Sequence, residues 1–258
     1  DELVLAVTSA EQARALETVL ASVDLTVSIM QAVDTGLGRE GSRSIEEAKA
    51  TADVIRAQPH MKLRGFYTHE GHTYGATPED QAAAFEAIYQ KINAVREAID
   101  PSLAIWPGCS VSAMVMATKP NVQAVRPGAY CFGDLALCHH ARVLGWEDAA
   151  VTILTTVVDR PEPGLALIDA GSKTFSGDKS RAGISGLELC NAKLEVVKCN
   201  EEHGYVKGEG VDDLKIGDRL RIVPAHICPV LNLADEVIVV RGETIVDIWP
   251  VEGRGKNR

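Results

Sequence analysis

The sequence predicts an α/β first half followed by an antiparallel β second half. Up to about residue 135, short apolar segments alternate with helical segments, and this alternation implies parallel strands in a barrel or a doubly wound sheet. From Ala149 onward the segments are short and β-rich, and turns such as Arg241-Gly242-Glu243 join them. We expect the boundary within residues 133–148 and divide the chain into residues 1–140 and 141–258.

Strand–helix units fill the first half. Ser9 is a typical N-cap for the first helix, and Pro78 is typical of the first turn of the third. The predicted strands are Leu3–Val7, Thr26–Val33, Lys62–Thr68, Leu103–Trp106 and Val122–Val125, and the predicted helices lie near 10–21, Ile45–Ala57, Pro78–Ile99 and Val111–Ala117. A closed (β/α) barrel has eight units in about 250 residues, so either this sheet is open or about three units, roughly 100 residues, are absent.

The second half is predicted to be an antiparallel β domain of short segments. They are rich in Val, Ile, Leu and Thr and are too short for core helices. The predicted strands are Thr152–Val158, Leu165–Ile168, Ala192–Lys198, Gly204–Lys207, Arg219–Val223, Val237–Arg241 and Thr244–Trp249.

Composition excludes some classes of partner. The chain has 258 residues, 46% hydrophobic and 24% charged, with a net charge of −10 and no run of Lys or Arg. Nucleic acid and anionic membrane surfaces are therefore poor partners. No apolar run approaches the ~20 residues of a membrane span, and no signal peptide opens the chain. The six cysteines are widely spread, which favours reduced thiols and a cytoplasmic protein.

In parallel α/β folds, chemistry gathers on the loops after the strands. After the second strand, a glycine-rich loop presents Arg39, although an ordinary turn with a solvated arginine has the same pattern. After the third strand, two tyrosines (Tyr67 and Tyr74), two histidines and a glutamate fall within ten residues. Hydrogen-bonded surface aromatics are the alternative for this segment.

Two further loops suggest a phosphate site. Gly108, Ser110 and Ser112 precede a short helix, where backbone N–H groups and hydroxyls suit a phosphate, although a simple Ser N-cap has the same sequence. After the fifth strand, Gly128 and Tyr130 form a second glycine turn near a tyrosine. Two such loops on adjacent strands indicate one phosphorylated cofactor.

A histidine and a cysteine two residues apart are the candidate metal ligands. We expect Pro224–Pro229 to be extended, so that His226 and Cys228 point to the same face. Imidazole and thiolate are ready ligands for zinc. The alternative is a buried cysteine beside a hydrogen-bonded histidine.

Together these loops resemble the fold-type III pyridoxal phosphate (PLP) enzymes. The Asp34–Gly41 loop, Tyr67-Thr68-His69 and Arg126–Tyr130 look like alanine racemase signatures. The longer Tyr67–Tyr74 run and His226-x-Cys228-Pro229…Asn232 are similar to the D-serine dehydratase and D-threonine aldolase branch. The resemblance implies an alanine racemase-like, TIM-type (β/α) barrel, incomplete here at about five of eight units. An antiparallel β domain with a divalent metal follows it.

The resemblance also implies roles for individual residues. Arg39 would contact the phenolic oxygen of PLP. Tyr67 would lie against the pyridine ring or the aldimine, and Tyr74 would face the substrate; with His203 these two tyrosines are the expected catalytic residues. His203 matches a family histidine near the active site. The expected phosphate contacts are Gly108, Ser110, Ser112, Gly128 and Tyr130, and the expected metal ligands are His226 and Cys228.

The resemblance has one gap. The family holds PLP through a Schiff base to a lysine near the end of the first barrel strand, and no segment here matches that motif. Lys49 and Lys91 fall on predicted helices, Lys62 begins a strand and Lys119 follows a helix. The chain also opens without Met inside an apolar strand. We expect it to begin roughly 100 residues late, after that lysine.

Three functions stay open. The first is a zinc-dependent PLP lyase, a D-serine dehydratase that forms pyruvate and ammonia, because by family likeness His-x-Cys accompanies zinc and dehydration. The second is a D-threonine aldolase that forms glycine and acetaldehyde and uses Mn²⁺ or Mg²⁺. The third is a non-catalytic PLP-barrel protein, if the chain is complete. A racemase is disfavoured, since the metal pair has no use in it. The expected partner is a small D-amino acid, and related enzymes are commonly homodimers.

Overall fold

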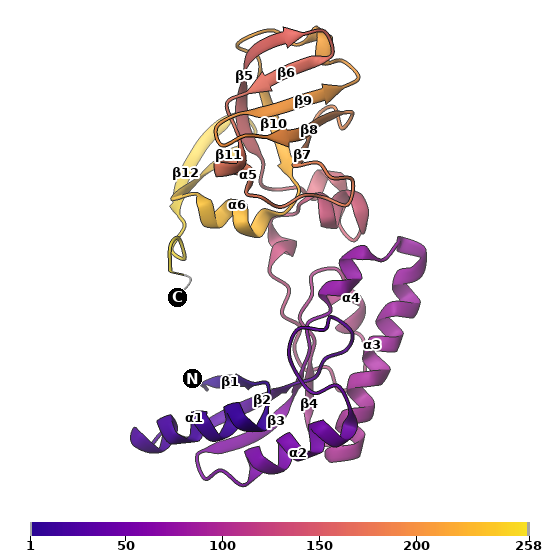
Figure 1. Ribbon diagram of the computed structural model, residues 1–258, viewed down its shortest axis with the longest axis vertical. Helices are drawn as coiled ribbons and strands as arrows, with labels where there is room; N and C mark the ends of the chain where they lie inside the picture. Colours follow the sequence, from indigo (N-terminus) through magenta and orange to yellow (C-terminus); the bar gives the residue numbers. More distant parts are fainter. Residues whose placement is uncertain (1, 257–258) are drawn as a thin grey trace. The chain divides into compact units, whose positions relative to one another are not determined.

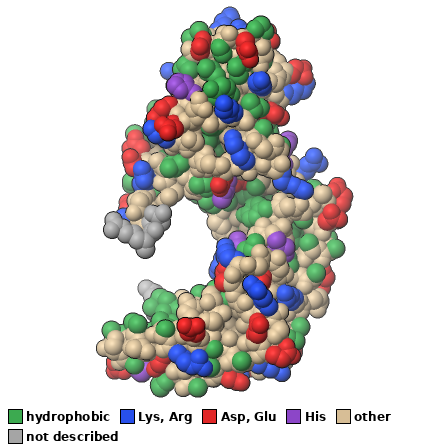
Figure 2. Space-filling view, in the orientation of Figure 1, with side chains coloured by type: hydrophobic (Ala, Val, Ile, Leu, Met, Phe, Trp, Pro, Cys, Tyr) green, Lys and Arg blue, Asp and Glu red, His purple; other side chains and the backbone are tan. Residues whose placement is uncertain are grey.

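The computed structural model describes residues 2–256. The chain divides into two compact units, Asp1–Gly128 (unit 1) and Ala129–Arg258 (unit 2), which are described separately. Within the described residues, no helix is both long enough and apolar enough to cross a membrane. On the face shown in Figure 2, Lys and Arg side chains are interspersed with Asp and Glu.

Unit 1 is built on a four-stranded parallel sheet in the order β1-β2-β3-β4. The strands are β1 (Val4–Val7), β2 (Val27–Ala32), β3 (Met61–Tyr67) and β4 (Ala104–Trp106). Between them run α1 (Ala10–Ser22), α2 (Ile45–Arg56) and α3 (Pro78–Ile99), and the short α4 (Ala113–Met116) follows β4 (Figure 1). Ser9, Ser44 and Thr77 each accept a backbone N–H at the N-terminus of a long helix. The predicted alternation of strands and helices is confirmed.

The fifth predicted strand, Val122–Val125, is not formed as a strand. It is reduced to one parallel bridge between Ile105 and Val122. The segment still runs along β4, because Ile105 N donates to Asn121 O and Gln123 N to Ile105 O, at 3.1 and 3.2 Å. Pro127, which has no N–H, ends the pairing soon afterwards. Unit 1 thus holds four strands and a fifth segment in strand position, an open part of an alanine racemase-like barrel.

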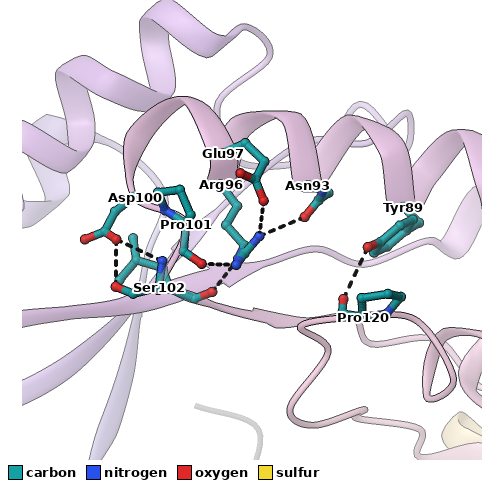
Figure 3. Close-up of polar contacts among 9 residues, drawn as sticks. Tyr89, Asn93, Arg96, Glu97, Asp100, Pro101, Ser102 and Pro120 are labelled. Atoms are coloured by element: carbon teal, nitrogen blue, oxygen red, sulfur yellow. Dashed lines mark hydrogen bonds and ion pairs between the residues drawn. The ribbon is translucent and has the colours of Figure 1, made fainter.

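Arg96 ties the end of α3 to the chain that enters β4. Its side chain is 5% exposed and donates to Leu103 O at 2.7 Å, Asn93 Oδ1 at 3.1 Å and the carbonyl of Pro101 (Figure 3). A buried guanidinium is tolerated because these acceptors replace its water. The contact fixes where β4 begins and therefore where the loop after β4 lies.

Unit 2 contains a closed antiparallel barrel in the order β10-β5-β6-β9-β8-β7. Its inward-facing residues, among them Val157, Ile168 and Val206, are fully buried. The strands are β5 (Ile153–Glu162), β6 (Leu165–Ile168), β7 (Gly186–Glu188), β8 (Leu194–Cys199), β9 (Gly204–Gly208) and β10 (Arg219–Pro224), and β11 (Glu236–Arg241) pairs with β12 (Thr244–Pro250) as a separate hairpin. The antiparallel β domain is confirmed; the short β7, which closes the barrel, was not predicted.

The remaining helices of unit 2 are short. They include a π-helix, η3 (Leu135–His140), and two α-helices, α5 (Ser172–Phe175) and α6 (Ile227–Leu233). Single-turn 3₁₀ segments are η1 (Gly71–Gly75) in unit 1 and η2 (Ala129–Cys131), η4 (Trp146–Asp148) and η5 (Val211–Asp213) in unit 2. The π-helix and α6 bear directly on the candidate site.

Candidate functional site

Asp34 shapes the loop after β2 in unit 1. Its buried carboxylate accepts the N–H groups of Gly36 and Gly38 at 2.9 and 3.1 Å. Both glycines have positive φ, +140° and +76°, which side chains rarely adopt. Burial opposes the charge of Asp34, but these N–H groups and nearby cations outweigh it and hold its pKa below the ordinary value. The loop is thereby fixed as it leads into Arg39.

Arg39 and Tyr67 line one small pocket. Arg39 is largely exposed and pairs with Glu40, with 2.7 Å between Nη2 and Oε1. The hydrogen bond to Glu40 raises the pKa of Arg39, so it remains a cation. The pocket is also lined by Asp34, Glu40 and His69. The structure thus brings together two residues predicted to contact the cofactor.

Arg126 is a cation at this site that belongs to a predicted signature loop but was given no role from the sequence. Its guanidinium lies 5.1 Å from the centre of the Tyr67 ring and donates to Thr68 O at 2.8 Å. Burial raises the pKa of Tyr67 and keeps its phenol neutral. The only signal in the sequence was the position of Arg126 at the start of a glycine loop.

Glu70 is a second residue that sequence reasoning did not assign. It is fully buried and accepts Gly108 N–H at 3.3 and 3.2 Å and the Ser112 hydroxyl at 3.3 Å. Burial raises the pKa of Glu70 to about 7, although these donors oppose the shift. A carboxylate therefore engages two of the predicted phosphate donors.

The loop after β4 nevertheless suits an anion. A Cβ added to Gly108 would lie 2.4 Å from Arg126 Nη2, so the loop backbone closely approaches a guanidinium. Gly108, Ser110 and Ser112 are all buried there, at the carboxyl end of the sheet. This cation and the neighbouring Tyr67 suit the phosphate and the ring of a phosphorylated ring cofactor. Gly108 and Ser112 would have to share or exchange their bonds with Glu70 to hold its phosphate.

The other predicted residues lie apart along the chain. Tyr74 is half-buried in η1. Gly128 is the last residue of unit 1, and Tyr130, which is 54% exposed, lies in η2 of unit 2. His203 is exposed in the turn between β8 and β9, where its carbonyl accepts Asn200 N–H at 2.8 Å. Their predicted roles stay predictions.

The segment with His226 and Cys228 is not extended, so that expectation is wrong. His226 precedes α6 as its N-cap, with φ −145° and ψ 114°, and Cys228 lies in the first turn of the helix. The cause is a distant one, because buried Asp134 accepts Ile227 N–H at 3.1 Å and thereby caps the helix. Cys228 is exposed, so the alternative of a buried cysteine does not hold either.

The two candidate ligands nevertheless meet. A hydrogen bond between Cys228 and His226 is the largest cause that raises the pKa of His226 to about 9, against the effect of burial. His226 Nδ1 also lies 2.6 Å from Asp178 Oδ2. A metal ion bound by both side chains would take the place of the proton in this hydrogen bond.

Two protein donors fit an open metal site. Within residues 2–256, no group of three or more His, Cys, Asp or Glu side chains could hold a metal ion. Structural zinc sites have four protein ligands and catalytic sites usually three with one open position, so this pair alone would leave two or more positions to other donors, substrate or water. The donor chemistry, nitrogen and sulfur, favours zinc.

This fold and these strand-end residues define a fold-type III PLP protein. Residues 1–136 match the family described as "Alanine racemase, N-terminal domain", and residues 150–240 match "Putative serine dehydratase domain". The chain belongs to the alanine racemase-like family, in the branch of D-serine dehydratases and D-threonine aldolases.

Curated relatives in this branch are lyases of hydroxylated D-amino acids. The chain is 30% identical over 246 residues to 3-hydroxy-D-aspartate aldolase from Paracoccus denitrificans, covering 89% of this chain and 61% of the relative. It is also 30% identical over 191 residues to D-threo-3-hydroxyaspartate dehydratase from a Delftia species, covering 65% of this chain and 50% of the relative. The chain thus spans about half to three-fifths of the length of these relatives.

Solved structures show the same fold. D-threonine aldolase from Filomicrobium marinum superposes with a TM-score of 0.85 at 22% identity, over 100% of this chain and 71% of that chain. A cysteine-to-alanine variant of D-threo-3-hydroxyaspartate dehydratase, described in the metal-free form, has a TM-score of 0.85 at 23% identity, over 96% of this chain and 72% of that chain.

Proposed function

We propose that the protein is a PLP- and zinc-dependent lyase that removes water from a D-β-hydroxy amino acid, with D-serine as the first substrate to test. The contact between His226 and Cys228 at the start of α6 carries this proposal. Imidazole and thiolate together select zinc over Mn²⁺ or Mg²⁺. A dehydratase relative described in a metal-free form after loss of a cysteine is a further reason to test Cys228.

In this proposal, residues of unit 1 bind the cofactor and residues of unit 2 bind zinc. When bound, PLP is an electron sink for the carbanion at Cα, and zinc is a Lewis acid for the β-hydroxyl. Arg39 would hold a phenolic oxygen in the pocket after β2, and Tyr67, backed by Arg126, would hold a ring in place. His226 and Cys228 would hold zinc. The net reaction would be D-serine to pyruvate and ammonia.

Aldol cleavage is the second candidate, and the relatives favour it. The relative matched over 89% of this chain is named an aldolase and splits a 3-hydroxy-D-amino acid. In that reaction the β-hydroxyl loses its proton and the Cα–Cβ bond breaks. D-threonine would give glycine and acetaldehyde, and 3-hydroxy-D-aspartate would give glycine and glyoxylate.

The two reactions differ in where the nitrogen goes. We would assay the complete gene product with PLP and zinc on D-serine, D-threonine and 3-hydroxy-D-aspartate. Ammonia with a keto acid supports dehydration, whereas glycine with an aldehyde supports aldol cleavage and overturns the dehydratase. If none of the three substrates gives either set of products, the proposal of a lyase of this class is wrong.

Variants then test the metal pair. His226→Ala and Cys228→Ala should each lower zinc affinity and turnover by about 100-fold or more, since loss of a direct ligand should cost more than loss of an outer-shell partner, which costs about 10- to 100-fold. Cys190→Ala is the matched control, because Cys190 is an exposed thiol of the same unit. Full activity in both ligand variants would remove the metal from the proposal.

A further inference from the structure

His226, one of the two candidate metal ligands, has a hydrogen-bond partner that was not predicted from the sequence. His226 Nδ1 lies 2.6 Å from Asp178 Oδ2, and Asp178 belongs to the loop after α5. A neutral imidazole has one protonated and one bare nitrogen, and a metal needs the bare one. A carboxylate that accepts the Nδ1 proton selects the tautomer in which Nε2 is free for a metal.

The loop that carries Asp178 is held in an unusual conformation. Ser176 has φ 67° and ψ −175°, a combination adopted almost only by glycine and strained for a residue with a side chain. The Ser176 hydroxyl accepts Asp178 N–H at 3.1 Å. The preceding residue, Phe175, is 1% exposed and anchors the turn in the core. The strained turn thus sets the direction in which the chain reaches Asp178.

A second carboxylate, that of Asp134, holds the backbone between the two candidate ligands. Asp134, 1% exposed, accepts Ile227 N–H at 3.1 Å and Leu137 N–H at 3.1 Å. Ile227 separates the two candidate ligands, so Asp134 holds the backbone between them. With this backbone fixed, the remaining freedom of His226 is rotation of its side chain, which Asp178 restricts.

We propose that Asp178 is a positioning residue that orients His226 for zinc and does not itself bind the metal. Its carboxylate meets Nδ1, while Cys228 hydrogen-bonds the same imidazole. The described residues also hold no cluster of three possible ligands. This inference rests on the proposed zinc role of His226 and Cys228.

Measurements of zinc affinity test the positioning role of Asp178 directly. We would titrate metal-free wild type, Asp178→Asn and Asp178→Ala with Zn²⁺ against a competing chelator. Loss of a carboxylate partner of a metal-binding histidine typically weakens binding about 10- to 100-fold. The matched control is Asp235→Asn, an exposed aspartate of unit 2 whose carboxylate pairs with Arg254, expected within about twofold of wild type.

Cobalt spectroscopy separates positioning from ligation. With Co²⁺ in place of Zn²⁺, Asp178→Asn should keep the thiolate charge-transfer band and the ligand-field bands of wild type once saturated. A changed ligand-field spectrum would make Asp178 a ligand and overturn the positioning role. Asp178→Glu, which keeps the carboxylate, should recover part of the lost affinity, and circular dichroism should show that all variants fold.

The zinc titrations show whether the role of Asp178 alone is wrong or the proposed zinc site is wrong as well. If wild type binds zinc and Asp178→Asn binds it equally well, the inference alone is wrong. If wild type binds no zinc, both the proposed metal role and the inference are wrong.

Discussion

Glu70 in unit 1 and Asp134 in unit 2 are both almost completely buried carboxylates at a candidate site, but their hydrogen bonds differ in kind. Glu70 accepts from Gly108 and Ser112, the donors that a phosphate would use. Asp134 accepts the N–H groups of Leu137 and Ile227, both at helix starts. Glu70 therefore competes with a ligand for its donors, whereas Asp134 belongs to the framework.

The two carboxylates also differ in how their charge can affect a ligand. Burial raises the pKa of both acids, and that of Glu70 reaches about 7. The charge of Glu70 therefore changes near neutral pH, next to the loop expected to hold a phosphate. Unit 1 therefore has a candidate anion site whose neighbouring carboxylate changes charge near neutral pH, whereas in unit 2 Asp134 holds the backbone between the candidate metal ligands.

Removing the framework carboxylate should have the largest effect. Asp134→Ala leaves two buried N–H groups without acceptors, each costing about 1–3 kcal/mol. We expect the free energy of unfolding of unit 2 to fall by about 2–5 kcal/mol. Urea denaturation followed by the fluorescence of Trp146 and Trp249 measures it. Asp134→Asn keeps one acceptor and should lose less; an unchanged midpoint in Asp134→Ala would contradict the framework role.

Neutralising Glu70 should flatten a pH dependence. Its folded pKa of about 7 lies above the ordinary 4.5. Its contribution to stability is therefore fully present below pH 4.5 and is lost as pH rises through about 7. The loss is on the order of 3 kcal/mol. Glu70→Gln should remove this slope in urea denaturation between pH 5 and 8, read from Trp106. An equal slope in the variant would show that other groups cause it.

The two glycines predicted to hold phosphate should respond differently. A Cβ on Gly108 would displace the Arg126 guanidinium, whereas a Cβ on Gly128 meets nothing within 4 Å. We expect Gly108→Ala to weaken PLP binding about tenfold, or 1.4 kcal/mol, and Gly128→Ala to change it less than twofold. Absorbance titration with PLP measures both. Equal losses would argue against the cation–loop contact as the anion site.

Arg39 should matter least for stability. Its side chain is 57% exposed, and exposed ion pairs such as that with Glu40 contribute about 0–1 kcal/mol. Arg39→Ala should leave the urea midpoint nearly unchanged while it weakens PLP binding and shifts the absorbance of the bound cofactor. A large drop in stability with normal PLP binding would make Arg39 a structural residue.

Local patterns predicted most of the secondary structure. The helix expected over Pro78–Ile99 has those bounds, because a first-turn proline and apolar spacing are properties of the segment itself. The strands of unit 1 are also confirmed, apart from Val122–Val125, whose pairing depends on β4. In unit 2, the three-residue β7 escaped prediction because its pairing with β8 and β10, not its composition, makes it a strand.

The candidate site shows the same division. The sequence by itself determined that His226 and Cys228 are near neighbours and that glycine loops follow the strands, because both are facts of spacing. Only the tertiary structure decided that the pair begins a helix, since its cap Asp134 is 93 residues away. It also brought in Asp178, 48 residues from His226, and buried Glu70. Burial and distant hydrogen-bond partners exist only in the folded chain, and they set the charge and orientation of these groups.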